Sequence, residues 1–255
     1  NQIWGSAASA DLDGDGYLDF VIPSKSKHLY IFDHTGLKLD FQTEVYLIGT
    51  PAIGELDGDE NLEIVFSGYS SNNKLFVINP DGSDVNGFPL DLGEKAKAGP
   101  ALADFNGNGR DDIVLGTDDD HIYLIYDDGS TAPGFPFTAT DKFQAAPSIL
   151  DIGGEKIIFA GNNDDNLYAI NESGELYPGF PINIGGTLIG SVVVANLDSD
   201  MFPEIIFGTD TGDMHIMHLD GSSYNQSPIP YPFSYHSAPL VWDIDDDGDL
   251  EIIAG

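Results

Sequence analysis

The chain has 255 residues, with 43 acidic side chains against nine basic ones and a formal net charge of −34 at pH 7. This charge repels phosphate backbones and anionic lipids, so the composition argues against nucleic-acid and membrane-surface binding. The absence of cysteine excludes disulfides, thiolate metal sites and c-type haem. Because no apolar run approaches the ~20 residues of a membrane span, we expect no membrane insertion.

An acidic segment recurs along the chain at offsets of 44 to 49 residues. Self-similarity at such a period is the sequence signature of a repeat architecture. A shorter copy, DIGGEKIIFA, begins at Asp151. The five full copies are DLDGDGYLDFVI from Asp11, ELDGDENLEIVF from Glu55, DFNGNGRDDIVL from Asp104, NLDSDMFPEIIF from Asn196 and DIDDDGDLEIIA from Asp243.

Each repeat predicts four short strands. The first is small and apolar, as in 51–56, and the second follows the acidic segment. The third alternates in polarity, as in 74–79, and ends at a turn that contains glycine. The fourth follows a Gly-Phe-Pro step, as at 87–89. No segment shows an apolar period of 3.6 residues, so we expect almost no helix.

Four-stranded units repeated every 40–50 residues are typical of propeller blades. We predict an all-β fold, a β-propeller of four-stranded antiparallel blades, as a single domain over 1–255. A parallel β-solenoid is the competing fold, although its repeats are usually shorter. The chain begins at Asn1 without Met or a leader, and its last blade is unfinished, so we expect a fragment of a longer protein with six to eight blades. The expected blades are 6–49, 50–97, 98–144, 145–188, 189–236 and, in part, 237–255.

The acidic segments place oxygen-bearing side chains at loop positions 1, 3, 5 and 9, and position 7 offers its backbone carbonyl. Alternate spacing turns successive side chains inward around a tight loop, which predicts a cage of oxygen ligands. The expected metal ligands are Asp11, Asp13, Asp15, Tyr17 and Asp19; Glu55, Asp57, Asp59, Asn61 and Glu63; Asp104, Asn106, Asn108, Arg110 and Asp112; Asn196, Asp198, Asp200, Phe202 and Glu204; and Asp243, Asp245, Asp247, Asp249 and Glu251.

A cage of six to eight flexible oxygen ligands favours calcium over magnesium, and the absence of His and Cys argues against zinc, copper and iron. We therefore expect about five structural Ca²⁺ sites. The fourth repeat, near Asp151, is two residues short and lacks the inner carboxylates, so we expect no ion there. Position 6 is glycine in three loops but Glu60 and Met201 in the other two, where the turn should differ.

The competing interpretation is that these segments are Asp- and Gly-rich hairpin turns chosen for backbone conformation and solubility. Five segments in register favour a cation, because the one copy with a different length has lost its ligand residues too.

The loops resemble the FG-GAP (VCBS-type) repeat family, the calcium-bearing β-propellers of bacterial secreted proteins and of the integrin α head. The DxDxDGxxD loop of that family stands here as DLDGDGYLD and DIDDDGDLE, and its Phe-Gly and Gly-x-Pro steps appear in part as Phe207-Gly208 and Gly99-Pro100-Ala101. The resemblance implies a seven-bladed ring, an extracellular, secreted or cell-surface location and adhesive or ligand-binding roles.

No catalytic constellation repeats or clusters in the chain, so the sequence favours a non-enzymatic, calcium-stabilised extracellular module with a binding, adhesion or structural role. Its partner is expected to be a protein, a glycan or further copies of itself. His215 falls in the column of Phe76 and Tyr123 and is expected to be a packing ring between blades.

The alternative is a secreted carbohydrate-active enzyme, such as a propeller-type polysaccharide lyase. It would need Lys97, Tyr235 or His236 at one channel mouth, on a face that should also present Trp4, Phe143 and Gln144.

Overall fold

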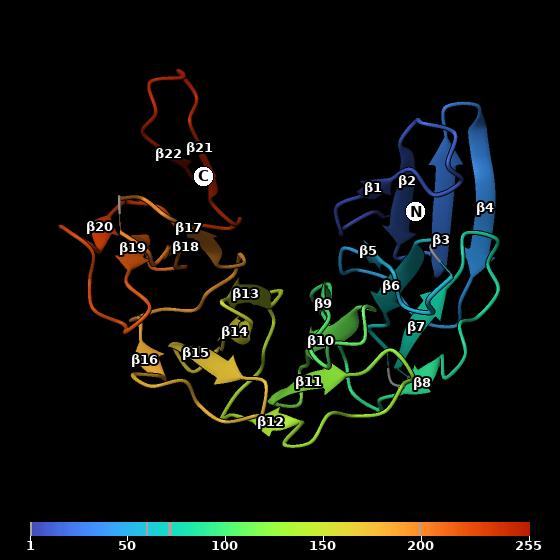
Figure 1. Ribbon diagram of the computed structural model, residues 1–255, viewed down its shortest axis with the longest axis horizontal. Coiled ribbons are helices and arrows are strands. Elements are labelled where there is room, and N and C mark those ends of the chain that lie inside the picture. The colour runs from blue at the N-terminus through green and yellow to red at the C-terminus, as the bar shows by residue number, and fades with distance from the viewer. Residues whose placement is uncertain (1, 60, 71–72, 199) are drawn as a thin grey trace. The chain divides into compact units, whose positions relative to one another are not determined.

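The computed structural model describes residues 2–59, 61–70, 73–198 and 200–255. In these ranges there is no helix, and the strands form five sheets of four strands and one of two (Figure 1). Every sheet is ordered along the chain and every pairing is antiparallel. The predicted four-stranded antiparallel units are confirmed. The β-solenoid alternative is wrong, because its strands would pair in parallel.

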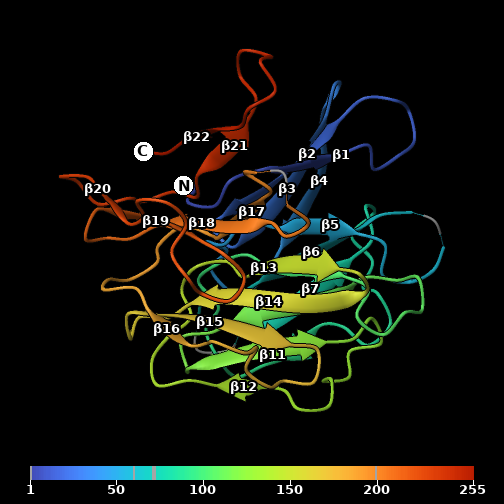
Figure 2. The same cartoon turned by 60° about the vertical axis from the view of Figure 1, so that its left-hand side comes forward.

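The chain divides into two compact units, 1–138 and 139–255. The first unit contains three four-stranded sheets, seen from a second side in Figure 2. Their strands are β1 (Ala8–Ala10), β2 (Asp19–Ser24), β3 (His28–Asp33) and β4 (Gly36–Gln42); β5 (Ala52–Gly54), β6 (Glu63–Ser67), β7 (Lys74–Ile78) and β8 (Leu90–Asp91); and β9 (Ala101–Ala103), β10 (Asp112–Gly116), β11 (His121–Ile125) and β12 (Phe137–Thr138).

The second unit contains two four-stranded sheets and the two-stranded one. Their strands are β13 (Ser148–Ile152), β14 (Glu155–Gly161), β15 (Asn166–Asn171) and β16 (Ile182–Asn183); β17 (Val193–Ala195), β18 (Glu204–Gly208), β19 (Asp213–Met217) and β20 (Ile229–Pro230); and β21 (Leu240–Trp242) and β22 (Glu251–Ile253).

The second strand of each sheet is the most deeply buried. Every residue of β6, β10 and β18 is buried, and apart from Ser67 at the end of β6 their sequences are apolar after the first residue. A strand that reads as a continuous apolar run is covered on both faces. In each unit, therefore, a sheet packs its two faces against neighbouring sheets.

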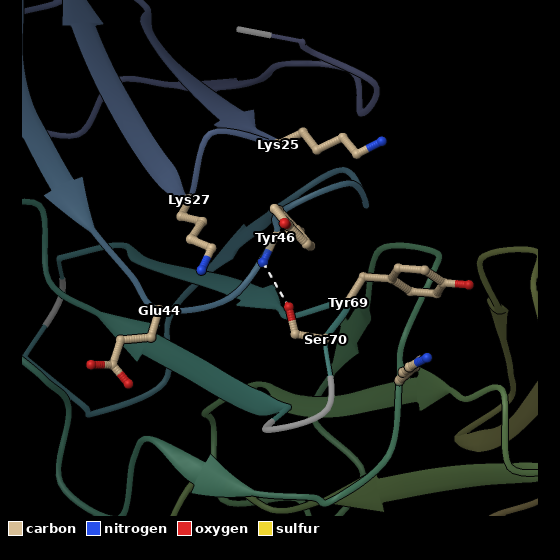
Figure 3. Close-up of a pocket in the computed structure, with 7 residues that line it drawn as sticks. Lys25, Lys27, Glu44, Tyr46, Tyr69 and Ser70 are labelled. Carbon is tan, nitrogen blue, oxygen red and sulfur yellow. Dashed lines mark hydrogen bonds between the residues drawn. The ribbon is translucent and has the colours of Figure 1, made fainter.

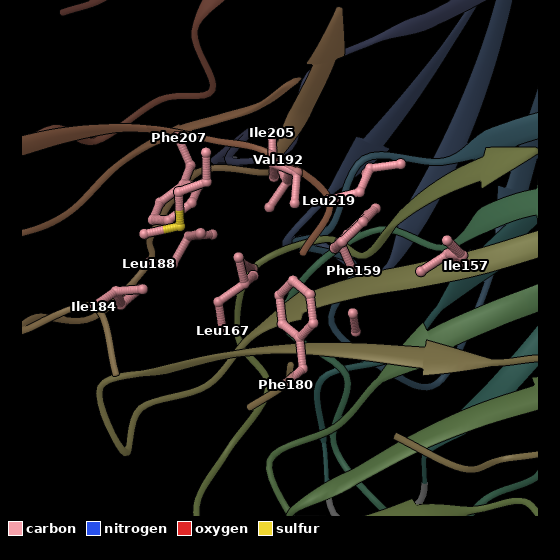
Figure 4. Close-up of a cluster of buried hydrophobic side chains, with 13 residues drawn as sticks. Ile157, Phe159, Leu167, Phe180, Ile184, Leu188, Val192, Ile205, Phe207 and Leu219 are labelled. Atoms are coloured by element: carbon pink, nitrogen blue, oxygen red, sulfur yellow. The ribbon is translucent and has the colours of Figure 1, made fainter. Parts of the chain in front are cut away.

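The core lies between neighbouring sheets. In the second unit one cluster joins β14 and β15 to β18, with Phe159, Leu167 and Phe207 each at most 1% exposed (Figure 4). In the first unit, one cluster lies between the sheets of β1–β4 and β5–β8 and a second between those of β5–β8 and β9–β12. The apolar second and third strands that the sequence predicts supply most of these side chains.

A cross-strand pair of rings recurs in the sheets. Phe66 of β6 is opposite Phe76 of β7, and Phe207 of β18 is opposite His215 of β19; in both pairs the rings stack with centroids 4.9 Å apart. His215 is 5% exposed, and burial lowers its pKa. The prediction that His215 is a packing ring is confirmed.

Glycine is required where neighbouring sheets approach each other by their backbones. Gly87, in the Gly-Phe-Pro step before β8, has φ +95°, and a Cβ atom there would lie 2.4 Å from the carbonyl oxygen of Asp128 beside β11. Gly93 has φ +68° but open space around its Cα. A substitution at Gly93 therefore tests the cost of the backbone conformation alone, whereas one at Gly87 adds the cost of a steric clash.

We expect Gly93→Ala to lower the free energy of unfolding by about 1–2 kcal/mol, because a left-handed backbone disfavours any Cβ atom. Gly87→Ala adds the clash with Asp128 and should cost clearly more. Urea unfolding of both variants measures the difference. Equal losses would contradict the close packing of these two sheets.

Candidate metal centres

The five predicted loops all connect the first strand of a sheet to the second. Residues 11–18, 55–62, 104–111, 196–203 and 243–250 form these connections. The residue at position 9 is the first residue of the second strand and pairs with the last residue of the first strand, as Asp19 does with Ala10 and Glu63 with Gly54. The predicted placement of the loops is therefore confirmed.

The carboxylate at position 9 closes each loop by a hydrogen bond across it. One of its oxygens accepts the backbone N–H of position 2 at 2.6–2.9 Å in all five loops. Glu63, Asp112 and Glu204 are fully buried where they do this. Sequence reasoning assigned these residues to the metal alone and missed their hydrogen bond to the backbone.

The carboxylate at position 1 folds the turn itself. In the first loop Asp11 accepts the N–H groups of Gly14, Asp15 and Gly16 at 2.8–3.1 Å. The side chains at positions 3 and 5 each accept the N–H group two residues later, as Asp15 does from Tyr17 at 2.8 Å. These bonds draw the acidic side chains toward the inside of the loop, where like charges crowd.

Four of the loops bring three carboxylates together, with one oxygen of each within 4.8 Å of the others, and each group could hold a metal ion. Asp19, Asp59 and Asp247 lie outside these groups, and Glu60 lies outside the described residues. Metal coordination by each predicted side chain and carbonyl stays a prediction. The groups are Asp11, Asp13 and Asp15; Glu55, Asp57 and Glu63; Asp198, Asp200 and Glu204; and Asp243, Asp245 and Glu251.

Glu63 is one of two buried glutamates with an oxygen that has no hydrogen-bond partner among the described residues. Its Oε2 accepts the N–H of Leu56, whereas its Oε1 is buried without a hydrogen-bond partner among the described residues. Burial, together with the charges of Asp57, Glu55 and Asp59, raises the pKa of Glu63 to about 7. Glu204 likewise has no hydrogen bond to Oε1, which lies 3.4 Å from Nδ1 of His218.

The third loop is built differently. Its inner positions hold Asn106 and Asn108, whose amide groups donate to Asp127 at 3.3 and 2.9 Å. Arg110 pairs with the other oxygen of Asp127 at 2.8 Å. Burial raises the pKa of Asp112 to about 6. Polar side chains thus occupy part of the space that acidic groups fill in the other loops.

In the fourth repeat a two-residue hairpin replaces the loop. Gly153 and Gly154 both have positive φ, 63° and 92°, and join β13 directly to β14. Such a turn suits the twist of an antiparallel pair. Lys156 pairs with Asp151 at 3.3 Å.

The structure corrects one expectation about the opposite ends of the sheets. Phe143 is fully buried, and Tyr235 is only 9% exposed and packs into the core of the second unit. Neither ring therefore lies on an exposed binding face, whereas Trp4 is 60% exposed and His236 is exposed. The sequence pattern marks aromatic positions but does not separate a core ring from a surface ring.

Comparison with known proteins supports the architecture. Residues 56–115 match the FG-GAP-like repeat family, so the predicted resemblance is confirmed over that segment. Curated proteins give no match. BBS1N, solved in complex with ARL6DN, superposes with a TM-score of 0.70 at 13% identity over all of this chain and 75% of that one.

Two bacterial structures are similar as well. The C-terminal domain of PilY1 from Pseudomonas aeruginosa has a TM-score of 0.69 at 13% identity, over 98% of this chain and 82% of that one. The biofilm matrix protein Bap1 of V. cholerae has a TM-score of 0.58 at 20% identity. The match covers 76% of this chain but only 31% of the Bap1 chain. The neighbours are β-propeller proteins, which confirms the predicted fold class. None of the described residues forms a helix long and apolar enough to cross a membrane.

We expect the chelated protein to become more stable as the pH falls from 7.5 to 5.5. The folded-state pKa of Glu63, about 7, exceeds its ordinary value of 4.5, so the native state binds more protons than the unfolded state between these values. Between pH 5.5 and pH 7.5 the free energy of unfolding therefore falls by about 2 kcal/mol. Thermal melts in a chelator at several pH values measure how stability depends on pH. Stability that does not change, or that rises with pH, would contradict the raised pKa of the buried Glu63.

Proposed function

We propose that the chain is a non-enzymatic, calcium-stabilised interaction module of an extracellular protein, a single β-propeller domain over 1–255. The observation that carries the proposal is Glu63, a buried carboxylate with one oxygen unpartnered and two further acidic groups within reach. A buried anion without a counter-charge is costly, and a cation at this point would remove the cost.

The chemistry of the donor set favours calcium. Each group of three offers carboxylate oxygens without His or Cys, and hard oxygen ligands suit Ca²⁺ and Mg²⁺ more than transition metals. We propose Ca²⁺ because the loops offer many oxygen ligands, whereas Mg²⁺ takes few protein ligands and retains its waters. The residues that would hold it are those at positions 1, 3, 5, 7 and 9 of the five loops, with the third loop weakest because Arg110 already brings a positive charge.

The role of the ions would be structural. Extracellular modules bind Ca²⁺ at roughly 0.1–1 mM, and at ten times the dissociation constant each site adds about 1.4 kcal/mol to the free energy of unfolding. Five such sites would together supply about 7 kcal/mol, which is comparable to the whole stability of a domain. The extracellular location draws support from the likeness to a biofilm matrix protein and from the FG-GAP-like segment.

We expect chelation to lower the melting temperature sharply and added Ca²⁺ to restore it, whereas Mg²⁺ at the same concentration restores it only in part. Differential scanning calorimetry at low salt is the measurement. The result that would rule out a structural role for calcium is a melt that does not respond to the chelator.

The variant Glu63→Gln distinguishes two roles of this side chain: binding of a metal ion and acceptance of a backbone hydrogen bond. Gln keeps an oxygen for the N–H of Leu56 but removes the buried charge. In chelator the variant should therefore be more stable than the wild type, and in calcium it should be less stable, because about 1.4 kcal/mol or more of ion binding is lost. The two melting curves should cross between these conditions.

The matched control for this variant is Asp151→Asn in the fourth repeat, where Lys156 already supplies the positive charge. Its calcium response should equal that of the wild type. If Glu63→Gln also responds to calcium as the wild type does, the second loop is a turn and not a metal site.

A further inference from the structure

A pocket of about 640 Å³ in the first unit is lined by lysine and tyrosine side chains (Figure 3). It lies where β2 turns into β3, β4 leads into β5, β6 leads into β7, and β8 leads into β9. A second hollow beside it shares Lys25 and Tyr46. The residues that line the first pocket are Lys25, Lys27, Glu44, Tyr46, Tyr69, Ser70 and Lys95.

The pocket and the acidic loops occupy opposite ends of the same sheets. In an antiparallel four-stranded sheet ordered along the chain, the connection between the first and second strands lies at one end, and the next connection lies at the other. The acidic loops are connections of the first kind, and the pocket is built from those of the second kind and from the links between sheets. The ligand of this pocket would therefore approach away from the acidic loops.

Backbone hydrogen bonds between neighbouring sheets hold the pocket in place. The N–H of Tyr69 donates to the carbonyl of Tyr46 at 2.8 Å, and the N–H of Asp118 donates to that of Lys95 at 2.7 Å. The hydroxyl of Ser70 accepts the N–H of Tyr46 at 3.1 Å, drawn in Figure 3. Because hydrogen bonds already fix the backbone of the pocket, ligand binding costs little further backbone entropy.

Three of the chain's nine lysine and arginine residues line this pocket, and none of the three has a carboxylate partner in the described part of the chain. Within the described residues no acidic oxygen lies within 4.0 Å of the ammonium groups of Lys25, Lys27 or Lys95. Each ammonium instead lies over an aromatic ring: Lys25 over Trp4 at 3.9 Å, Lys27 over Tyr46 at 5.3 Å and Lys95 over Tyr69 at 5.6 Å. In a chain with 43 acidic side chains, an unpaired cluster of cations is an unusual feature.

Lys27 also stands in a backbone conformation that does not favour lysine. Its φ is 71°, in the left-handed region, and the equivalent turn residues of other sheets are Asp120, Asp165 and Gly212. Asp, Asn and Gly tolerate this region better than a long side chain does. At this turn the chain thus carries a positive charge where the backbone alone would favour aspartate or glycine.

We propose that this pocket binds an acidic saccharide, through a carboxylate or sulfate group on one or two sugar rings. The lining offers three ammonium donors, and an anionic sugar is rich in acceptors, whereas the Tyr69 hydroxyl already donates to Asp118 at 3.1 Å. Tyr46 is 43% exposed, and the face of its ring away from Lys27 suits the apolar face of a sugar. Figure 3 shows the carboxyl group of Glu44 pointing away from both rings, so it leaves the pocket open to an anion.

Size and charge density separate this class of ligand from others. A volume of about 640 Å³ lies within the range of ligand pockets and takes a short saccharide. Nucleic acid carries one charge per ~1.7 Å of duplex, which the net charge of −34 would repel. A short uronate or sulfated sugar carries only one or two charges per ring, so the negative chain repels it less than it repels nucleic acid.

The inference rests on the proposed function in treating the chain as a binding module, but its residues are not those of the calcium loops. The full chain in calcium buffer is titrated by calorimetry with trigalacturonate, with a sulfated trisaccharide and with a neutral trisaccharide. We expect one of the two anionic sugars to bind at least tenfold more tightly than the neutral one, and the better of the two identifies the anionic group. Equal binding of all three, or of none, would overturn the proposal.

Variants of the pocket test the residues. Lys27→Asn and Lys95→Gln should each weaken binding about tenfold, the loss expected for one charge-assisted contact. Lys74→Gln, an exposed lysine at the start of β7, is the matched control and should bind as the wild type. Because asparagine suits the left-handed turn, Lys27→Asn should melt no lower than the wild type, so its lost binding could not be ascribed to unfolding.

The outcomes keep the two proposals apart. A normal calcium-dependent melt without saccharide binding overturns this pocket and leaves the structural calcium proposal standing. Saccharide binding that Lys27→Asn and Lys95→Gln weaken, in a protein whose melt ignores calcium, supports the pocket and overturns the calcium proposal. Binding of an acidic peptide in preference to every sugar overturns the assignment of the ligand class.

Discussion

The structure depends on a carboxylate placed at the point where the first strand of a sheet turns into the second. There the side chain begins a buried strand and accepts a backbone N–H across the acidic loop. A carboxylate suits this place because one oxygen satisfies the backbone, while the other can take a further partner, as Oδ1 of Asp112 accepts the N–H of Asp127. Glu63 shows the consequence, since its second oxygen is buried and unpartnered.

This arrangement concentrates negative charge at one end of the sheets. The strands themselves are held by apolar packing between neighbouring sheets, and glycines such as Gly87 let the backbones approach. In the first unit the opposite end carries unpaired lysines over aromatic rings. The charge pattern therefore separates a proposed structural function at one end from a proposed recognition function at the other.

Much of this architecture could be predicted from the sequence, because the repeat sets spacing and polarity together. The period located the loops between first and second strands, and the apolar runs located the buried second strands. The aromatic column identified His215 as a buried packing ring, which stacks on Phe207 of the neighbouring strand. What the repeat could not show was which aromatic rings on the other face are covered, and Phe143 and Tyr235 proved to be buried.

The lysine pocket was also beyond sequence reasoning. Lys27 and Lys95 are far apart in the chain and come together only through the links between sheets. The sequence does contain one sign of the pocket: Lys27 stands at the turn position that Asp120 occupies in the third repeat. This lysine is recognised as unusual only once the structure shows that the turn has a left-handed backbone.

The number of calcium ions that the folded chain retains tests the proposed metal loops most directly. Native mass spectrometry of the protein dialysed against calcium, with magnesium and chelator as references, measures this number. About five bound Ca²⁺ ions are expected, with the weakest in the third loop, and none should be retained after chelation. A spectrum in which the folded protein binds no calcium would contradict this expectation.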